Sequence, residues 1–235
     1  MRAELPTIAT WGASAFTAAG LPDIAVTALA HETFPLFRNS GKGSFADATY
    51  SSHIAALSQQ HSGWGTGFFD FNNDGWKDIF TSNSHVNDRV ELFEAAVYKE
   101  PDLVFGNLGN GTFAAVADSG LNEVKAHRGS SYADFDGDGR IDAVVASLGE
   151  PVELWRNTSP GENHWIALRL TGTRANRDGI GAHIRIDGQY NDMTSAVSYA
   201  SSSLMPVHFG LGRTTVVDRI EITCPGGQRE VLEKV

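Results

Sequence analysis

The residues of this chain best suited to chemistry are oxygen-bearing side chains that recur in two nine-residue stretches, residues 70–78 and 134–142. Both stretches place Asp or Asn at positions 1, 3, 5 and 9 and glycine at position 6, and position 7 can contribute a backbone carbonyl. Ca²⁺ takes about six to eight oxygen ligands, which a tight loop brings together. The sequence therefore predicts two Ca²⁺ sites with these ligand positions: Asp70, Asn72, Asp74, Trp76 and Asp78 in the first loop, and Asp134, Asp136, Asp138, Arg140 and Asp142 in the second.

The loops differ from the helix-flanked calcium loop of an EF-hand. That loop ends on a bidentate Glu at position 12, where this chain has Thr81 and Val145. The flanking residues 67–69 and 79–81 are rich in Phe and predict strands instead. A single Asp/Asn/Gly loop is often an ordinary solvated turn. Two copies with matching ligand positions and matching glycines favour calcium loops within β-hairpins.

Length and charge restrict the class of protein. The 235 residues can form one large all-β unit or two modest domains with a real core. The net charge of −10 argues against a nucleic-acid partner, because no basic surface is available to neutralise phosphates. No run approaches the roughly 18 apolar residues that span a membrane. Cys224 is the single cysteine, so no intrachain disulfide is expected.

A hairpin pattern alternates with the two loops. Residues 36–45 match residues 104–113, and residues 154–157 repeat the first half of that pattern. Each copy is a short apolar strand followed by an Asn/Gly turn, and the full copies continue into a return strand. Such an alternation predicts an all-β fold of partial β-propeller blades, with about four strands in each unit. The insertion at residues 86–101 predicts either one or two helical turns or an irregular loop.

The two ends of the chain depart from this repeat. Residues 20–24 align with residues 75–79, but the upstream ligand positions hold Ala15, Thr17 and Ala19, so we expect a degenerate first blade that does not bind Ca²⁺. The later part alternates apolar and polar residues, as half-buried strands do, in residues 165–170, 182–186 and 217–222. The sequence therefore predicts blades over residues 1–160 and a small antiparallel β domain over residues 161–235.

These residues resemble a known combination of domains. The two calcium loops are similar to FG-GAP/VCBS repeats, the blades of integrin-like β-propellers. Residues 84–86, 103–113 and 128–129 resemble the subgroup related to cartilage acidic protein. The last part resembles the ASPIC/UnbV domain, with matching motifs at residues 163–165, 176–182, 201–203 and 207–212.

The resemblance implies a fragment of a longer secreted or cell-surface protein, because so few blades cannot close a propeller ring. The family usually continues beyond the position of Val235, so the last domain is expected to be truncated. The family also usually has Trp where this chain has Cys224, which puts the local packing there in doubt.

Three functions stay open at this point. The first, which we favour, is a non-catalytic, calcium-binding scaffold or adhesion-type module outside the cell, with a protein or glycan ligand of unknown identity. The second is an accessory or catalytic domain of a secreted enzyme that acts on carbohydrate or lipid. Its acidic candidates are Glu91, Glu94, Glu100 and Asp102, although a solvated face explains them equally well. The third is a truncated product that does not fold alone.

No motif supports a catalytic site. The sequence has no G-x-S-x-G nucleophile elbow, and its eight histidines show no paired spacing for zinc. His85 and His164 lie in family-like motifs, where we expect structural roles. We therefore predict that the chain is not an enzyme.

Overall fold

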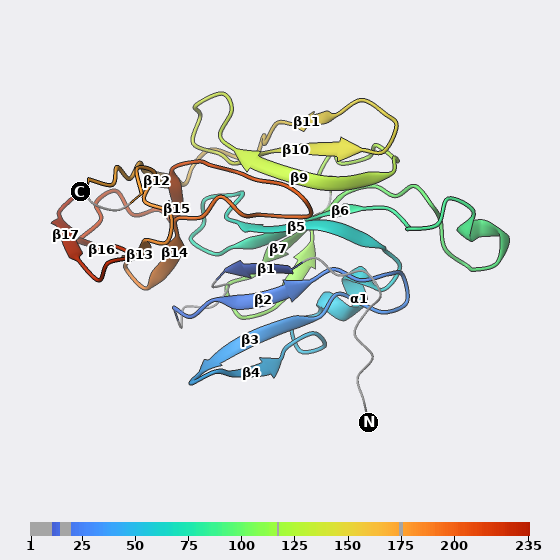
Figure 1. Ribbon diagram of the computed structural model, residues 1–235, viewed down its shortest axis with the longest axis horizontal. Coiled ribbons are helices and arrows are strands. Elements are labelled where there is room, and N and C mark those ends of the chain that lie inside the picture. Colours follow the sequence, from blue (N-terminus) through green and yellow to red (C-terminus); the bar gives the residue numbers. More distant parts are fainter. Residues whose placement is uncertain (1–10, 15–19, 117, 174–175) are drawn as a thin grey trace.

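The computed structural model describes residues 11–14, 20–116, 118–173 and 176–235 as a set of small antiparallel β-sheets (Figure 1). This confirms the all-β class. Two short helical segments occur among these residues, α1 (Ile54–Ser58) and the 3-10 turn η1 (Val90–Leu92). In this described part of the chain, no helix has the length and apolar character needed to cross a membrane.

Three sheets follow one another along the first part of the chain, each with its strands in sequence order. The first sheet consists of β1 (Trp11–Ser14), β2 (Asp23–Val26), β3 (Leu36–Gly41) and β4 (Ser44–Asp47). The second consists of β5 (Gly63–Phe69), β6 (Asp78–Asn83), β7 (Leu103–Asn107) and β8 (Phe113–Ala115). The third consists of β9 (His127–Ala133), β10 (Asp142–Ser147) and β11 (Glu153–Trp155).

These sheets confirm the hairpins read from the sequence. Residues 36–45 form β3 and the first half of β4, and residues 104–113 contain most of β7 and the start of β8. The third sheet has three strands among the described residues, where about four were predicted. The positions Ala15, Thr17 and Ala19 of the degenerate first loop lie outside the described residues.

The second sheet lies between the other two and supplies side chains to a core on each face (Figure 1). Successive residues of a strand point to opposite faces of its sheet. Phe68 and Ile79 accordingly join the core shared with the first sheet. Their neighbours Phe69 and Phe80 join the core shared with the third sheet. Because both faces of the sheet are covered, nearly every residue of β5 and β6 is buried, polar residues included.

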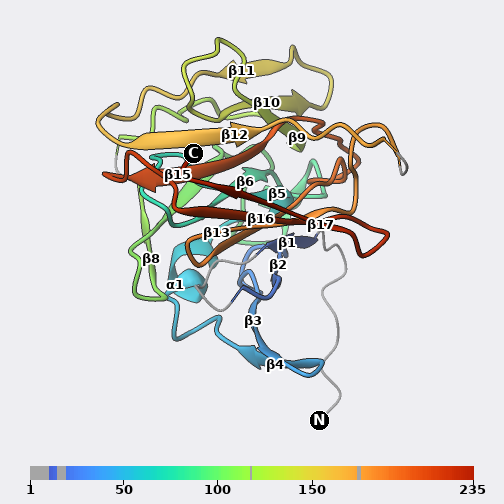
Figure 2. The same cartoon turned by 90° about the vertical axis from the view of Figure 1, so that its left-hand side faces the viewer.

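The last part of the chain forms two further sheets around a core of its own. One pairs β12 (His164–Leu168) with β15 (Val207–Gly212), which lie side by side in Figure 2. The other has the order β14 (Gln189–Asp192), β13 (His183–Ile186), β16 (Arg219–Thr223) and β17 (Arg229–Glu233). The predicted division after residue 160 falls between β11 and β12. That the two parts are separate domains stays a prediction.

The connection between β14 and β15 runs back along the β9 edge of the third sheet and covers it. The backbone N–H of Ser130 donates to Ser198 Oγ at 3.1 Å, and that of Tyr132 donates to Ser203 Oγ at 2.8 Å. Both donors belong to β9, which is an edge strand of its sheet. Serine hydroxyls thus satisfy edge N–H groups that would otherwise be open to pairing with another chain.

The insertion at residues 86–101 projects away from the sheets on the right of Figure 1. It contains one 3-10 turn, η1, and is otherwise irregular. The predicted helical turn and the predicted irregular loop therefore each describe part of it. Leu92 and Phe93, within the insertion, are exposed.

Candidate metal centre

The two predicted calcium loops occupy equivalent positions in the second and third sheets. The first connects β5 to β6 and the second connects β9 to β10. In each hairpin the ninth loop residue pairs with the residue before the loop: Asp78 with Phe69, and Asp142 with Ala133. The glycines at position 6, Gly75 and Gly139, have φ of 95° and 83°, a conformation that glycine adopts readily.

Backbone N–H groups hold the first loop around its leading carboxylate. Asp70 Oδ1 accepts from the N–H of Asp74 at 3.0 Å, and Asp70 Oδ2 accepts from that of Gly75 at 2.8 Å. Asp74 Oδ1 accepts from the N–H of Trp76 at 2.8 Å. The carboxylates therefore turn inward and organise their own loop.

The second loop repeats these contacts residue by residue. Asp134 Oδ1 accepts from the N–H of Asp138 at 3.0 Å, and Asp134 Oδ2 accepts from that of Gly139 at 2.8 Å. Asp138 Oδ1 accepts from the N–H of Arg140 at 3.0 Å. Two loops of different sequence thus share one backbone arrangement.

The ninth residue of each loop closes the hairpin onto the next strand. The carboxylate of Asp78 accepts from the N–H of Phe71 at 3.0 Å and from that of Asn107 at 2.8 Å. Asp142 makes the equivalent contacts, with Phe135 at 3.0 Å and Asn157 at 2.7 Å. In the first sheet, Asp23 Oδ1 accepts from the N–H of Asn39 at 2.7 Å. The degenerate first copy therefore retains this structural contact.

The acidic side chains gather more closely in the second loop than in the first. Asp134, Asp136 and Asp138 each offer an oxygen atom, and these atoms lie within 4.8 Å of one another. Asp142 does not join that group, and no group of three acids is found in the first loop among the described residues.

Two guanidinium groups contact the gathered carboxylates of the second loop. Arg140 forms an ion pair with Asp138, and Arg156 Nε lies 2.6 Å from Asp136 Oδ2. The sequence predicts Arg140 only as a Ca²⁺ ligand through its backbone carbonyl oxygen, and it gives no prediction for Arg156. These cations neutralise the oxygens that were assigned to Ca²⁺, and they must move aside for an ion to bind.

The first loop is more deeply buried and has no arginine contact of this kind among the interactions described. Burial raises the pKa of Asp70 to about 8, and the charges of Asp74 and Asp78 add to the shift. Burial likewise raises the pKa of Asp78 to about 7, although N–H groups of Asn107 and Phe71 oppose it. Buried carboxylates that lie this close together repel one another when ionised, and a divalent cation such as Ca²⁺, which prefers hard oxygen ligands, would relieve that repulsion.

The C-terminal sheets contact both loops directly. Gly212 donates its N–H to the carbonyl of Asn73 at 2.8 Å, and His208 Nε2 donates to the carbonyl of Gly139 at 3.0 Å. Burial lowers the pKa of His208, so its neutral ring makes this bond. Trp165 stacks on the His208 ring with centroids 6.0 Å apart.

The two loops also contact each other, and a loop lysine reaches β14. Asn73 Nδ2 donates to the carbonyl of Gly139 at 3.0 Å. Lys77 Nζ donates to the carbonyl of Tyr190 at 3.2 Å and to Asn191 Oδ1. Both candidate metal sites and the C-terminal part therefore form one junction.

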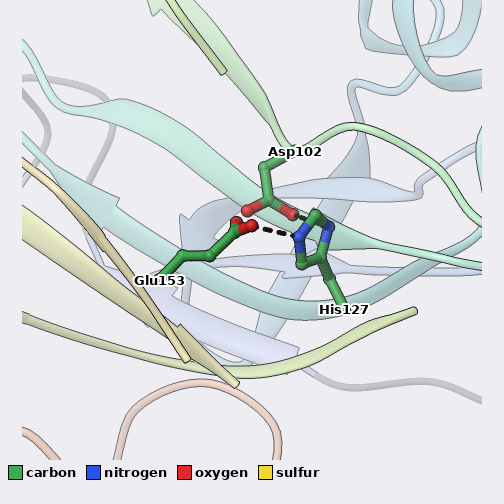
Figure 3. A group of neighbouring side chains, drawn as sticks. All are labelled: Asp102, His127 and Glu153. Carbon is green, nitrogen blue, oxygen red and sulfur yellow. Dashed lines mark hydrogen bonds and ion pairs between the residues drawn. The ribbon is translucent and has the colours of Figure 1, made fainter. Parts of the chain in front are cut away.

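The sequence missed a second group of possible ligands, formed by Asp102, His127 and Glu153 (Figure 3). All three are buried, as is Glu100. The interpretation of Glu100 and Asp102 as part of a solvated face is therefore wrong. The three residues come from three separate segments of the chain, so no local spacing in the sequence predicts that they lie together.

Comparison with known proteins matches two families to separate stretches of the chain. Residues 16–81 match a family described as FG-GAP-like repeat. Residues 172–235 match the family described as ASPIC and UnbV. The first match includes the loop at residues 70–78, and the second loop lies outside both matches.

Two curated proteins show distant similarity over most of the chain. Cartilage acidic protein 1 of Mus musculus is 25% identical over 249 residues, which cover 82% of this chain and 38% of that protein. Cartilage acidic protein 1 of Homo sapiens is 24% identical, with 82% and 37% covered. The chain thus spans well under half the length of these relatives. It combines an FG-GAP-like repeat with an ASPIC and UnbV domain, and over most of its length it is distantly similar to cartilage acidic protein 1.

Proposed function

We propose that this chain is a non-catalytic, calcium-binding scaffold module in which two Ca²⁺ ions hold the FG-GAP-like sheets against the ASPIC/UnbV part. In this proposal the three sheets are propeller blades, and the ligands of the two ions are those predicted from the sequence. The observation that carries it is the shared backbone arrangement of the two loops, both of which the C-terminal sheets contact.

The geometry supports a structural role for the ions rather than a sensing one. The loops lie at the same ends of two adjacent sheets and touch through Asn73 and Gly139. A cation in each loop would cancel repulsion between converging carboxylates. It would thereby fix the backbone carbonyls of Asn73 and Gly139, which accept hydrogen bonds from Gly212 and His208 of β15. Calcium modules outside the cell bind with Kd values of about 10⁻⁴ to 10⁻³ M, which suits a permanently loaded joint in that environment.

Burial of Glu100 and Asp102, two of the four acidic candidates, supports a non-catalytic module, whereas Glu91 and Glu94 are exposed. Glu100 accepts from the N–H of Ser62 at 3.1 Å and lies 3.0 Å from His61 Nδ1. Asp102 is paired with His127. These carboxylates are thus engaged inside the protein instead of facing a carbohydrate or lipid. Recognition of a protein or glycan partner is assigned in this proposal to exposed loops, which carry such functions in rigid β scaffolds.

Hydrogen exchange on the full chain tests the proposed joint. Saturating Ca²⁺ at about 100 times Kd should add about 2.7 kcal/mol per site to the free energy of unfolding. We expect it to slow amide exchange in both loops and also in β12 and β15, which supply no calcium ligand. Asp134→Asn should reduce this protection, whereas Asp88→Asn, an exposed acid outside the loops, should not. Protection confined to the loops would contradict the joint, and no protection at all would contradict calcium binding.

A further inference from the structure

A buried histidine lies between two carboxylates at the ends of the sheets opposite the calcium loops. Asp102 precedes β7, His127 begins β9 and Glu153 begins β11. The calcium loops join the end of β5 to the start of β6 and the end of β9 to the start of β10. Because neighbouring strands are antiparallel, the starts of β7, β9 and β11 all lie at the far ends. The group is therefore separate from the candidate calcium sites.

Both nitrogens of the His127 ring face oxygen atoms (Figure 3). Nδ1 lies 2.9 Å from Asp102 Oδ1 and 3.1 Å from the carbonyl of Glu100. Nε2 lies 3.1 Å from Glu153 Oε2. The side chains of Asp102 and His127 are fully buried and that of Glu153 nearly so. Each of the three residues offers a ligand atom within 4.8 Å of the others.

One oxygen of this group has no hydrogen-bond partner. Asp102 Oδ1 accepts from His127 and from the N–H of Asn83 at 3.1 Å. Asp102 Oδ2 is buried and unpaired, and Figure 3 shows it on the side of the carboxyl group that faces Glu153. Buried polar atoms are almost always satisfied, so an unpaired carboxylate oxygen beside a second carboxylate marks a position suited to a cation.

We propose that Asp102, His127 and Glu153 bind a divalent transition-metal ion, with Zn²⁺ as the ion of choice. One imidazole nitrogen and two carboxylate oxygens match the ligands that Zn²⁺ accepts. Ca²⁺ does not fit equally well, because it prefers an all-oxygen shell. Lys125, which pairs with Glu153 Oε1, leaves Oε2 of that carboxylate for the ion. The ion would tie the second sheet to the third at their far ends.

Zinc binding must displace a proton from the His127 ring. In the metal-free chain the two ring nitrogens meet only acceptor oxygens, so the ring donates from both and holds the two carboxylates as an imidazolium. Metal binding and this proton-held ion pair therefore compete for the same nitrogen. The competing arrangement leaves Asp102 Oδ2 unpaired, whereas a bound ion satisfies it.

The test measures zinc on the full chain with the calcium loops saturated. The protein is unfolded in the presence of a chelator and then refolded in excess Ca²⁺. It should then take up one Zn²⁺ per chain in equilibrium dialysis. Co²⁺ in place of Zn²⁺ should give the visible absorption of a low-symmetry site with nitrogen and oxygen ligands. His127→Gln should weaken uptake at least tenfold. His164→Gln, an exposed histidine, and Asp88→Asn, an exposed acid outside both loops, should leave it unchanged.

Asp102→Asn keeps the test decisive if His127→Gln fails to fold. The amide retains an oxygen for Asn83 and His127 and places an NH₂ group where the unpaired oxygen lies, facing Glu153. This variant should match or exceed the wild-type melting temperature without metal, yet should lose the rise in melting temperature that Zn²⁺ gives the wild type. Absence of zinc uptake, or equal uptake by wild type and Asp102→Asn, would overturn the proposal in favour of the proton-held pair. Either result leaves the calcium proposal untouched.

Discussion

Raising the pH should destabilise the calcium-free protein, and Ca²⁺ should abolish that effect. Without metal, burial raises the pKa of Asp70 from its ordinary value of 3.8 to about 8 and that of Asp78 to about 7. The folded state therefore binds more protons than the unfolded state between about pH 4 and pH 7 to 8. Stability from these groups is fully present below the unfolded pKa and is lost as pH rises through the folded pKa.

The size of the effect follows from the shifts. Each pH unit within this window lowers the free energy of unfolding by about 1.4 kcal/mol for one such group. From pH 5 to pH 7 the calcium-free protein should lose about 3 kcal/mol through Asp70, and Asp78 adds a contribution of the same sign. Bound Ca²⁺ keeps both carboxylates ionised, so the slope disappears and the stabilisation by Ca²⁺ grows with pH.

Urea denaturation at several pH values, with chelator and with saturating Ca²⁺, measures both slopes. Asp70→Asn cannot ionise and should reduce the slope of the calcium-free protein. The exposed control Asp88→Asn should retain it. A calcium-free protein whose stability is flat or increases between pH 5 and pH 7 would refute the view that burial holds the pKa values of Asp70 and Asp78 above their ordinary range.

Three further changes test other contacts of the same region. A Cβ at Gly210 would lie 2.0 Å from Asp70 Oδ2, so Gly210→Ala should weaken Ca²⁺ binding at the first loop at least tenfold, as measured by calorimetry. The control Gly226→Ala, where a Cβ meets nothing within 4 Å, should leave the binding unchanged. Asn157 donates to two backbone carbonyls at 2.7 and 3.1 Å, so Asn157→Ala should lower the free energy of unfolding by about 1 to 3 kcal/mol in urea. Arg156 contacts the carboxylates of Asp136 and Asp138, which it would have to release to a bound Ca²⁺, so we expect Arg156→Gln to tighten binding there several-fold.

Local features of the fold could be predicted because turn chemistry is encoded in neighbouring residues. The nine-residue loops and the Asn/Gly hairpins carry their own glycines and their own hydrogen-bonding side chains, and both formed where they were predicted. The short helix α1 was not predicted. Its five residues, Ile54–Ser58, are too few to show a helical period, and it packs Ile54 into the first core.

Contacts between distant segments could not be predicted in this way. His208 and Gly210 reach the two nine-residue loops from β15, about 70 residues after the second loop, and no spacing within the sequence relates them. The group of Asp102, His127 and Glu153 exists only because β7, β9 and β11 start at the same ends of two stacked sheets. Such placements depend on how sheets pack, which a pattern of residues does not specify.

Calorimetric titration with Ca²⁺ of the full chain, first freed of metal by a chelator, tests directly whether both loops bind the ion. We expect two ions per chain, with Asp134→Asn removing one of them and leaving the first loop able to bind. A stoichiometry of two in the wild type and one in the variant would support the assignment of both loops. Absence of binding heat at millimolar Ca²⁺, or a stoichiometry unchanged by the substitution, would contradict it.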